Sequence, residues 1–172
     1  MDATTKAATG IEDWVRVAEH ADGQALAEPI FQRRYRASAP DFPIHVLAHC
    51  RTADGDWRPA CYIHITEDDG LLLGGGVCVD DRVLRRLPFA ARRQLHAVGG
   101  LYLHTLRWAM KQYGPRCDAM FGYCGDVLAE RLDLAAGFRK TPHPHLLVYY
   151  PAPLPEARAQ ALVARAHAAS PF

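Results

Sequence analysis

Hydrophobic and polar residues follow a pattern in the middle of the chain that predicts three antiparallel strands. Residues 44–50, 57–66 and 71–79 are alternating or continuously apolar, which suits strands with one or both faces buried. Two short segments rich in Asp and Gly, residues 52–56 and 67–70, separate them and favour tight turns. The pattern therefore predicts a three-stranded antiparallel meander.

The residues before the meander follow a helical period. Apolar positions from 11 to 18 recur at the spacing of one helix face, and residues 24–36 repeat this pattern around Pro29. We therefore expect two helices ahead of the first strand. Residues 1–10 are small and polar, and we expect them to be flexible.

After the meander, the pattern alternates between helix and strand. A helix that joins the third strand to a fourth would make that pair parallel, by a right-handed crossover. The predicted class is therefore α+β with a mixed central sheet, in one domain over residues 11–150. A Pro-rich connector and a C-terminal helix complete the chain at residues 151–172. The predicted elements are a short helix at 80–87, a loop at 92–100, a helix at 101–113, a strand at 119–124, a helix at 127–136, a strand at 145–150 and a helix at 156–169.

Composition narrows the class of protein. Hydrophobic residues make up 49% of the 172 residues, which predicts a substantial core. The formal net charge is +1, so we expect neither a nucleic acid nor an anionic membrane as partner. The start of the chain lacks a signal peptide and no apolar run reaches membrane length, so we expect a cytoplasmic protein. The five cysteines form no C-x-x-C pair, and we expect reduced thiols.

The segment at residues 92–100 carries the most informative chemistry. A loop with small residues that opens a helix leaves backbone amides unpaired, and the helix dipole adds positive potential there. Such an end attracts an anion such as a diphosphate. Arg92 and Arg93 precede the glycines and add charge, although a solvated basic helix face would show the same residues.

This order of elements, together with two local motifs, resembles the GNAT superfamily of acyl-CoA-dependent N-acyltransferases. The family's loop reads Q/R-x-x-G-x-G/A, and Gln94 to Gly99 fits it with Ala97 in place of the first glycine. The second motif ends in Gly137-Phe138 before an apolar strand, and Asp133 stands where the family often has a tyrosine. The resemblance covers about residues 43–150.

The resemblance implies a V-shaped gap between the third and fourth strands that binds acyl-CoA, with no metal ion. The pantetheine arm would lie along the third strand and the diphosphate on the loop and helix start. A small-molecule or protein amine would attack the thioester from the other side of the gap. The implied cofactor-binding residues are Val77, Cys78, Val79, Arg92, Arg93, Gln94, Ala97, Val98, Gly99, Gly100 and Leu101.

Three side chains are candidates for proton transfer. Tyr123, at the end of the fourth strand, could protonate the leaving thiolate, and Asp133 could act if burial raised its pKa. His64, on the side of its strand expected to be polar, could deprotonate the amine. Each also has a structural interpretation, as a packed aromatic, an exposed helix residue and a solvent-facing histidine. His143 and His145 are two apart, but no carboxylate or thiol accompanies them as a metal site would require.

Three interpretations stay open from the sequence. The first is an acetyl or related acyltransferase acting on an amine. The second is a GNAT-fold binding or regulatory module without catalysis, which Ala97 and Asp133 favour. The third is a transferase for an unusual acyl donor, because the insert after Val79 could reshape the acyl pocket. The exposed edge of the meander would allow a homodimer.

Overall fold

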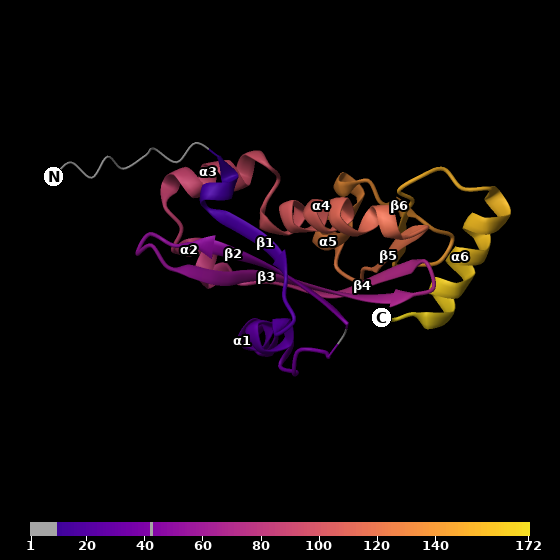
Figure 1. The fold of residues 1–172 in the computed structure, drawn as a ribbon, viewed down its shortest axis with the longest axis horizontal. Coiled ribbons are helices and arrows are strands. Elements are labelled where there is room, and N and C mark those ends of the chain that lie inside the picture. Colours follow the sequence, from indigo (N-terminus) through magenta and orange to yellow (C-terminus); the bar gives the residue numbers. More distant parts are fainter. Residues whose placement is uncertain (1–9, 42) are drawn as a thin grey trace.

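The computed structural model describes residues 10–41 and 43–172, so residues 1–9 of the segment predicted to be flexible, 1–10, lie outside the described residues. A mixed sheet with strand order β1-β2-β3-β4-β5-β7-β6 forms the centre of the molecule (Figure 1). Its antiparallel meander and the parallel β4–β5 pair confirm the predicted α+β class. The strands are β1 (Val15–Glu19), β2 (Ile44–Arg51), β3 (Trp57–Asp68), β4 (Leu71–Val79), β5 (Ala119–Tyr123), β6 (Arg139–Lys140) and β7 (Leu146–Tyr149).

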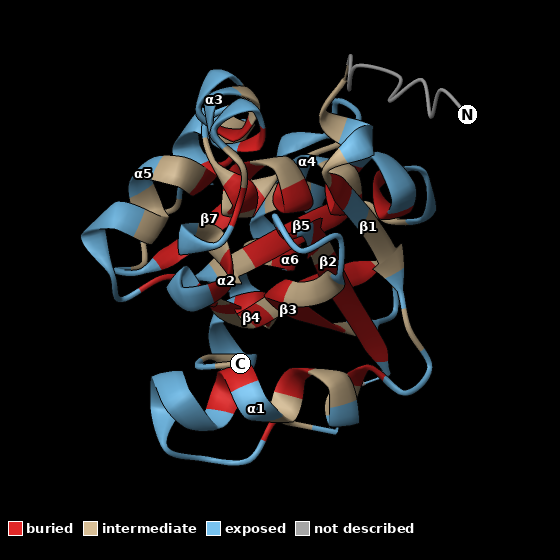
Figure 2. Ribbon diagram, turned by 90° about the vertical axis from the view of Figure 1, so that its left-hand side faces the viewer, coloured by how far each residue is buried: buried red, intermediate tan, exposed pale blue. Residues whose placement is uncertain are grey.

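Helices cover both faces of the sheet (Figures 1 and 2). One face carries α3, α4 and α5, and the other carries α1 at one end and α6 at the other. Within the described residues, every helix is too short or too polar to cross a bilayer. The α-helices are α1 (Gly23–Tyr35), α2 (Asp81–Arg85), α3 (Phe89–Ala97), α4 (Leu101–Tyr113), α5 (Val127–Ala136) and α6 (Glu156–Ala169), and 3-10 turns occur at Ile11–Asp13 and Gly114–Arg116.

The main core lies between the sheet and helices α4 and α5. Helix α4 contributes Leu106, Ala109, Met110 and Tyr113, and all four are buried. These residues recur at the spacing that places them on one helix face, as the sequence pattern predicted. The helix therefore packs its apolar side on β2 and β3 and leaves Arg107 and Lys111 exposed.

The first predicted helix is wrong. Residues 11–13 form a single 3-10 turn, and β1 follows at Val15–Glu19. Strand β1 pairs antiparallel with β2, with Val15 opposite Cys50. The apolar residues from 11 to 18 suggested one helix face because a turn followed by a strand produces similar spacing over a few residues. Pairing with an existing sheet edge then decides the conformation.

The predicted loop at residues 92–100 is also wrong over most of its length. Helix α3 occupies Phe89–Ala97, so Arg92, Arg93, Gln94 and Ala97 are helical and the loop contains only residues 98–100. Pro88 stands just before the helix, a position where the missing amide is no loss. Two smaller differences are β6, which was not predicted, and β7, which begins at Leu146 where we expected residue 145.

Candidate functional site

The parallel strands β4 and β5 separate half-way along their length. They pair from Leu71 opposite Ala119 to Gly74 opposite Gly122. Beyond that point β4 continues to Val79 paired with β3, whereas β5 continues beside β7. The second half of β4 therefore has a backbone edge that no strand of the described sheet occupies, as the predicted V-shaped gap requires.

A bulge in β4 lies where the strands separate. The β3–β4 register shifts between Tyr62 and His64, and Gly76 has a φ of +52°. A Cβ atom at Gly76 would lie 2.1 Å from Cε1 of His64. Only glycine combines this backbone conformation with such close contact. The neighbouring Gly75 is also closely packed, because a Cβ atom there would lie 2.3 Å from the carbonyl oxygen of Phe172.

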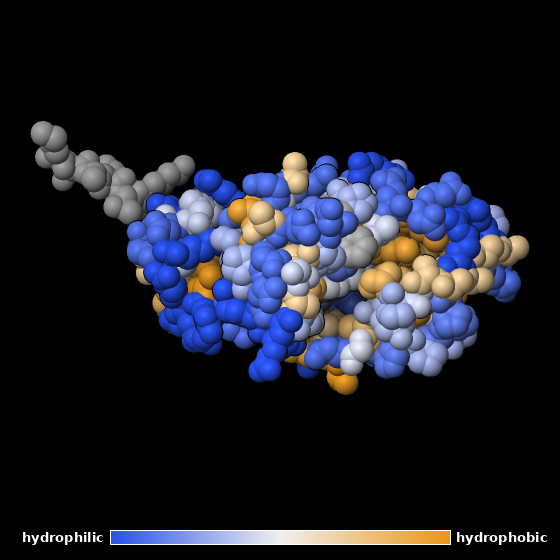
Figure 3. All heavy atoms as spheres, turned by 90° about the horizontal axis from the view of Figure 1, so that it is seen from below, coloured by the Kyte–Doolittle hydropathy of each residue, from blue (hydrophilic) through white to orange (hydrophobic). Residues whose placement is uncertain are grey.

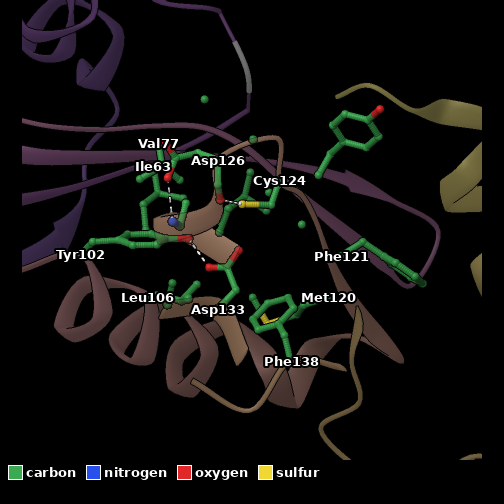
Figure 4. Close-up of a pocket in the computed structure, with 18 of the residues that line it drawn as sticks. Ile63, Val77, Tyr102, Leu106, Met120, Phe121, Cys124, Asp126, Asp133 and Phe138 are labelled. Carbon is green, nitrogen blue, oxygen red and sulfur yellow. Dashed lines mark hydrogen bonds between the residues drawn. The ribbon is translucent and has the colours of Figure 1, made fainter. Parts of the chain in front are cut away.

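A cavity of about 160 Å³ lies in the gap (Figure 4). Its mouth is formed by the glycines of β4, by Val77 and by residues 122–126 after β5. Its inner wall is apolar and reaches the main core between the sheet and α4. The inner wall is lined by Ile63, Ile65, Leu72, Leu106, Met120 and Phe138.

The main polar group of the cavity wall is a hydrogen-bonded pair from two helices. The hydroxyl of Tyr102 in α4 donates to Oδ1 of Asp133 in α5, at 2.5 Å. Figure 4 shows the phenol and the carboxyl group pointing toward each other at the base of the cavity. Asp133 is 5% exposed, and burial raises its pKa to about 6 although the bond from Tyr102 opposes that shift. Burial, together with this carboxylate, raises the pKa of Tyr102 well above its ordinary value.

The rim between β5 and α5 is held by two local hydrogen bonds. The side chain of Asp126 accepts from the amide of Ala129 at 2.9 Å, so it caps α5 as the sequence indicated. Cys124 donates through Sγ to the carbonyl of Asp126 at 3.3 Å, and burial raises the pKa of its thiol to about 11. A thiol that stays protonated is a poor nucleophile, so Cys124 is a wall residue.

No protein-family model matches the sequence, and neither does any curated protein. Solved structures, in contrast, match over most of the chain. The ribosomal-protein-S18-alanine N-acetyltransferase from Escherichia coli superposes with a TM-score of 0.51 at 12% identity, over 83% of this chain and 97% of that one. The chain has the GNAT fold.

Two further structures give weaker matches. A GNAT family acetyltransferase from Brucella melitensis, in complex with acetyl-CoA, matches with a TM-score of 0.46 at 12% identity, over 82% of this chain and 91% of that one. The protein AtaT, complexed with acetyl-methionyl-tRNAfMet, matches with a TM-score of 0.39 at 13% identity, over 86% of this chain and 98% of that one. Likeness at this level of identity concerns the fold alone.

Within the GNAT fold, the backbone edge of β4 already carries one contact. The hydroxyl of Tyr35, at the end of α1, donates to the carbonyl of Val77 at 2.5 Å. Of the three predicted strand contacts, Val77 alone lines the cavity. Cys78 is buried against α1, where burial raises the pKa of its thiol to about 12, and Val79 packs toward α2 and α3.

The glycine loop is shorter than predicted, and its amides serve the preceding helix. The amides of Val98, Gly99 and Gly100 donate to carbonyls of the last turn of α3. Both glycines have positive φ, which allows the chain to leave α3 and begin α4 at Leu101 within three residues. In the described part of the chain, the amides of residues 101–103 have no hydrogen-bond partner, so the anion-attracting group is the first turn of α4.

The predicted phosphate-binding side chains lie apart from the cavity. Arg93, Gln94 and Ala97 line a depression on the outer side of α3, and none of them lines the central cavity. The guanidinium of Arg93 lies 6.0 Å from the ring centre of Phe89, and Arg92 is exposed. Their role in cofactor binding stays a prediction.

Strongly hydrophilic residues cover part of the face that Figure 3 shows, over α1 and α2. Four arginines line a surface depression there, at the end of β4, and one of them, Arg33, forms an ion pair with Asp80. The four residues are Arg33, Arg34, Arg82 and Arg85.

The remaining catalytic candidates occupy different places. Tyr123 is 36% exposed at the mouth of the cavity, with its ring beside those of His145 and Phe172. We expected His64 on a polar strand face, but that face is covered by α1 and His64 is buried behind the bulge. Burial lowers the pKa of His64 to about 4, so its ring is neutral at pH 7. Tyr102, which sequence reasoning missed, has no signal beyond its helical spacing.

The two histidines of the His-Pro-His segment face different partners. His143 stacks on the ring of His167 in α6, at 3.7 Å between ring centres. His145 lies with Nδ1 3.1 Å from the carbonyl oxygen of Cys124. The segment is a turn before β7, so the shared strand face that would have placed both rings together does not form.

Proposed function

We propose that the protein is an acyl-CoA-dependent N-acyltransferase that moves an acyl group from CoA to a primary amine. The observation that carries this proposal is the cavity between the separated halves of β4 and β5, with a buried carboxyl group at its base. An open strand edge provides hydrogen bonds for an extended ligand, and the buried carboxyl provides a proton carrier. The GNAT fold is compatible with this chemistry but does not by itself establish it.

Binding would use the backbone more than side chains. The amide part of the pantetheine arm would pair with the free edge of β4 at Val77, where it replaces the hydroxyl of Tyr35. The diphosphate would lie at the first turn of α4, on the free amides of residues 101–103. Arg92, Arg93 and Gln94, on the neighbouring turns of α3, would contact only those phosphate groups of CoA that lie on the outer side of that helix.

The chemistry we propose has two coupled proton movements. The neutral amine attacks the thioester carbonyl, so that a C–N bond forms, the C–S bond breaks and the CoA thiolate leaves. Asp133 accepts the proton that the amine nitrogen loses and returns it to the thiolate sulfur. A pKa of about 6 makes its carboxylate the prevailing form at pH 7.5 and its acid strong enough to protonate a thiolate. Tyr102 orients the carboxyl group.

For the acceptor we propose only the reacting group, a primary amine. A small-molecule amine and the amine of a protein are both compatible with a cavity that opens beside Tyr123. A tRNA-linked amine is a further outcome to test, since AtaT was solved with acetyl-methionyl-tRNAfMet. The net charge of +1 still leads us to expect no nucleic acid partner. Cytoplasmic location and homodimer formation likewise stay predictions.

A direct test combines binding with turnover. Thermal unfolding is measured with and without millimolar CoA, because a ligand bound only by the folded state stabilises it by about 2.7 kcal/mol at a hundredfold excess over Kd. Release of free thiol from acyl-CoA is then followed with a panel of amines. Binding without thiol release for any amine would favour the regulatory module, and the absence of binding would refute both uses of the cavity.

A further inference from the structure

The cavity extends beyond what an acetyl group can fill. Its inner part, which we call the acyl chamber, is lined by side chains that also form the main hydrophobic core. Ile63, Ile65 and Leu72 from the sheet are each 2% exposed, and they face Leu106 and Ala109 of α4 across the chamber. Figure 4 shows Leu106, Met120 and Phe138 grouped around this end of the cavity.

The volume sets a scale for the group that fits. The whole cavity measures about 160 Å³, which is close to the ~150 Å³ of an apolar cavity known to hold benzene. On this measure a site for one water molecule, about the size of a methyl group, needs about 10–15 Å³. An acetyl group would therefore leave most of the cavity empty, whereas a group of about six carbons would fill it.

The chemistry of the wall selects hydrocarbon over polar groups. Tyr102 and Asp133 are hydrogen-bonded to each other, and the thiol of Cys124 donates to a backbone carbonyl. Oδ1 of Asp133 and the thiol of Cys124 are thus engaged, which leaves Oδ2 of Asp133 for proton transfer at the thioester, and the remaining wall of the chamber is apolar. A saturated or aromatic chain in the chamber would make close packing contacts with this apolar wall.

The entrance to the chamber is kept open by a missing side chain. Gly74 is the last residue of β4 that pairs with β5, and a Cβ atom there would meet only the carbonyl oxygen of Phe121, at 3.4 Å. A thioester whose pantetheine lies along Val77 thus has its acyl carbon beside the opening, with the chamber beyond it.

We propose that the acyl chamber binds the acyl chain of the donor, and that the preferred donor is a medium-length or aromatic acyl-CoA of about four to seven acyl carbons. This inference rests on the proposed function, because it assigns a donor to the same crevice. The product would be the corresponding N-acyl amine and free CoA.

The test is a comparison of donors with the intact chain. Dissociation constants are measured by calorimetry for CoA and for acetyl-, butanoyl-, hexanoyl-, benzoyl- and dodecanoyl-CoA. Each buried methylene should tighten binding about fourfold until the chamber is full. We therefore expect hexanoyl- or benzoyl-CoA to bind at least tenfold more tightly than acetyl-CoA, and dodecanoyl-CoA to lose this gain.

Variants on helix α4 provide matched controls. Ala109→Leu should fill the chamber and weaken hexanoyl-CoA at least tenfold with little effect on acetyl-CoA. Leu106→Ala should enlarge the chamber and shift the preference toward longer chains. Met110→Ala removes a similarly buried apolar side chain of the same helix that does not line the cavity, so it should leave the preference unchanged.

Three results would overturn the inference, and the first two are distinguishable. If acetyl-CoA binds as tightly as hexanoyl-CoA in the wild type, the chamber does not hold the acyl chain, although acyl transfer itself survives. If none of the CoA compounds binds, both the inference and the proposed function are wrong. The third result is a shift in preference with Met110→Ala as large as that with Leu106→Ala, which would overturn the inference even if Ala109→Leu does not fold.

Discussion

Replacement of Asp133 by Asn should stabilise the protein at alkaline pH and abolish turnover. The side chain of Asp133 is 5% exposed, and burial raises its pKa from an ordinary 3.8 to about 6. The carboxylate is thus less stable in the folded protein than in the unfolded chain. Asparagine has nearly the same shape, keeps an oxygen that can accept from Tyr102, and carries no charge.

The sign and size of the effect follow from linkage. Because the pKa of Asp133 is raised in the folded state, the contribution of this group to stability is fully present below about pH 4, where it is protonated in both states. Stability is lost as the pH rises through about 6, since the unfolded chain releases this proton more easily. A difference of about two pKa units, at 1.36 kcal/mol each, gives about 3 kcal/mol as an upper bound at pH 8.

Urea unfolding of wild type and Asp133→Asn at pH 4 and pH 8 measures this effect. The difference between the two proteins removes the contribution of other titrating groups. We expect the variant to gain up to 3 kcal/mol relative to wild type on going from pH 4 to pH 8. Its kcat should fall by about a hundredfold or more, because an amide cannot carry the proton. A difference in stability that is the same at both pH values would refute the reasoning.

Three further predictions concern the elements that build the crevice. Gly76→Ala should lower the unfolding free energy by 2 kcal/mol or more in urea titrations, because the backbone is left-handed and a buried histidine lies against the new methyl group. Gly55→Ala, which also has a positive φ (+90°) but open space around the new methyl group, should lose about half as much. Tyr35→Phe should tighten CoA binding by about two- to tenfold in calorimetry, because the ligand no longer displaces the hydroxyl from Val77. Asp126→Ala should lower the unfolding free energy by about 1 kcal/mol through loss of the α5 cap, measured in the same titrations.

The sequence predicted those parts of the fold that depend on local periodicity and turn residues. The meander, the crossover through α4 and the cap of α5 at Asp126 have strong local signals, and the structure confirms them. The prediction failed for β1, where a helix was expected, because its five residues give too short a pattern to decide between helix and strand. It is a strand because the edge of β2 offers backbone partners, which a one-dimensional pattern does not record.

The site was predicted in outline and missed in detail for a similar reason. The gap between β4 and β5 was expected from the resemblance to the GNAT superfamily, and the parallel pair that it needs was predicted from the order of the elements. The pairing of Tyr102 with Asp133 joins residues 31 positions apart on two helices. The sequence placed Asp133 on α5 but gave no means of finding its partner or its burial. The loop at residues 92–100 failed because two glycines were taken to define a loop that α3 almost fills.

The energetics of the crevice bear on the choice between an enzyme and an inactive module. Core side chains that line an unfilled crevice lack packing partners on one side, which lowers the unfolding free energy. The ionised Asp133 adds up to about 3 kcal/mol, and whole domains are stable by only about 5–15 kcal/mol. Both destabilising features lie in the same crevice, where catalysis would need an open volume and a proton carrier.

The double variant Ala109→Leu with Asp133→Asn tests this argument. It removes both features, so in an enzyme it should melt at a higher temperature at pH 8 than wild type and should have lost turnover. In a module that only binds CoA, the same variant should keep most of its affinity, because the amides at the start of α4 and the edge of β4 are unchanged. A double variant less stable than wild type at pH 8 would show that neither feature is a stability defect, and the inference from energetics to catalysis would then fail.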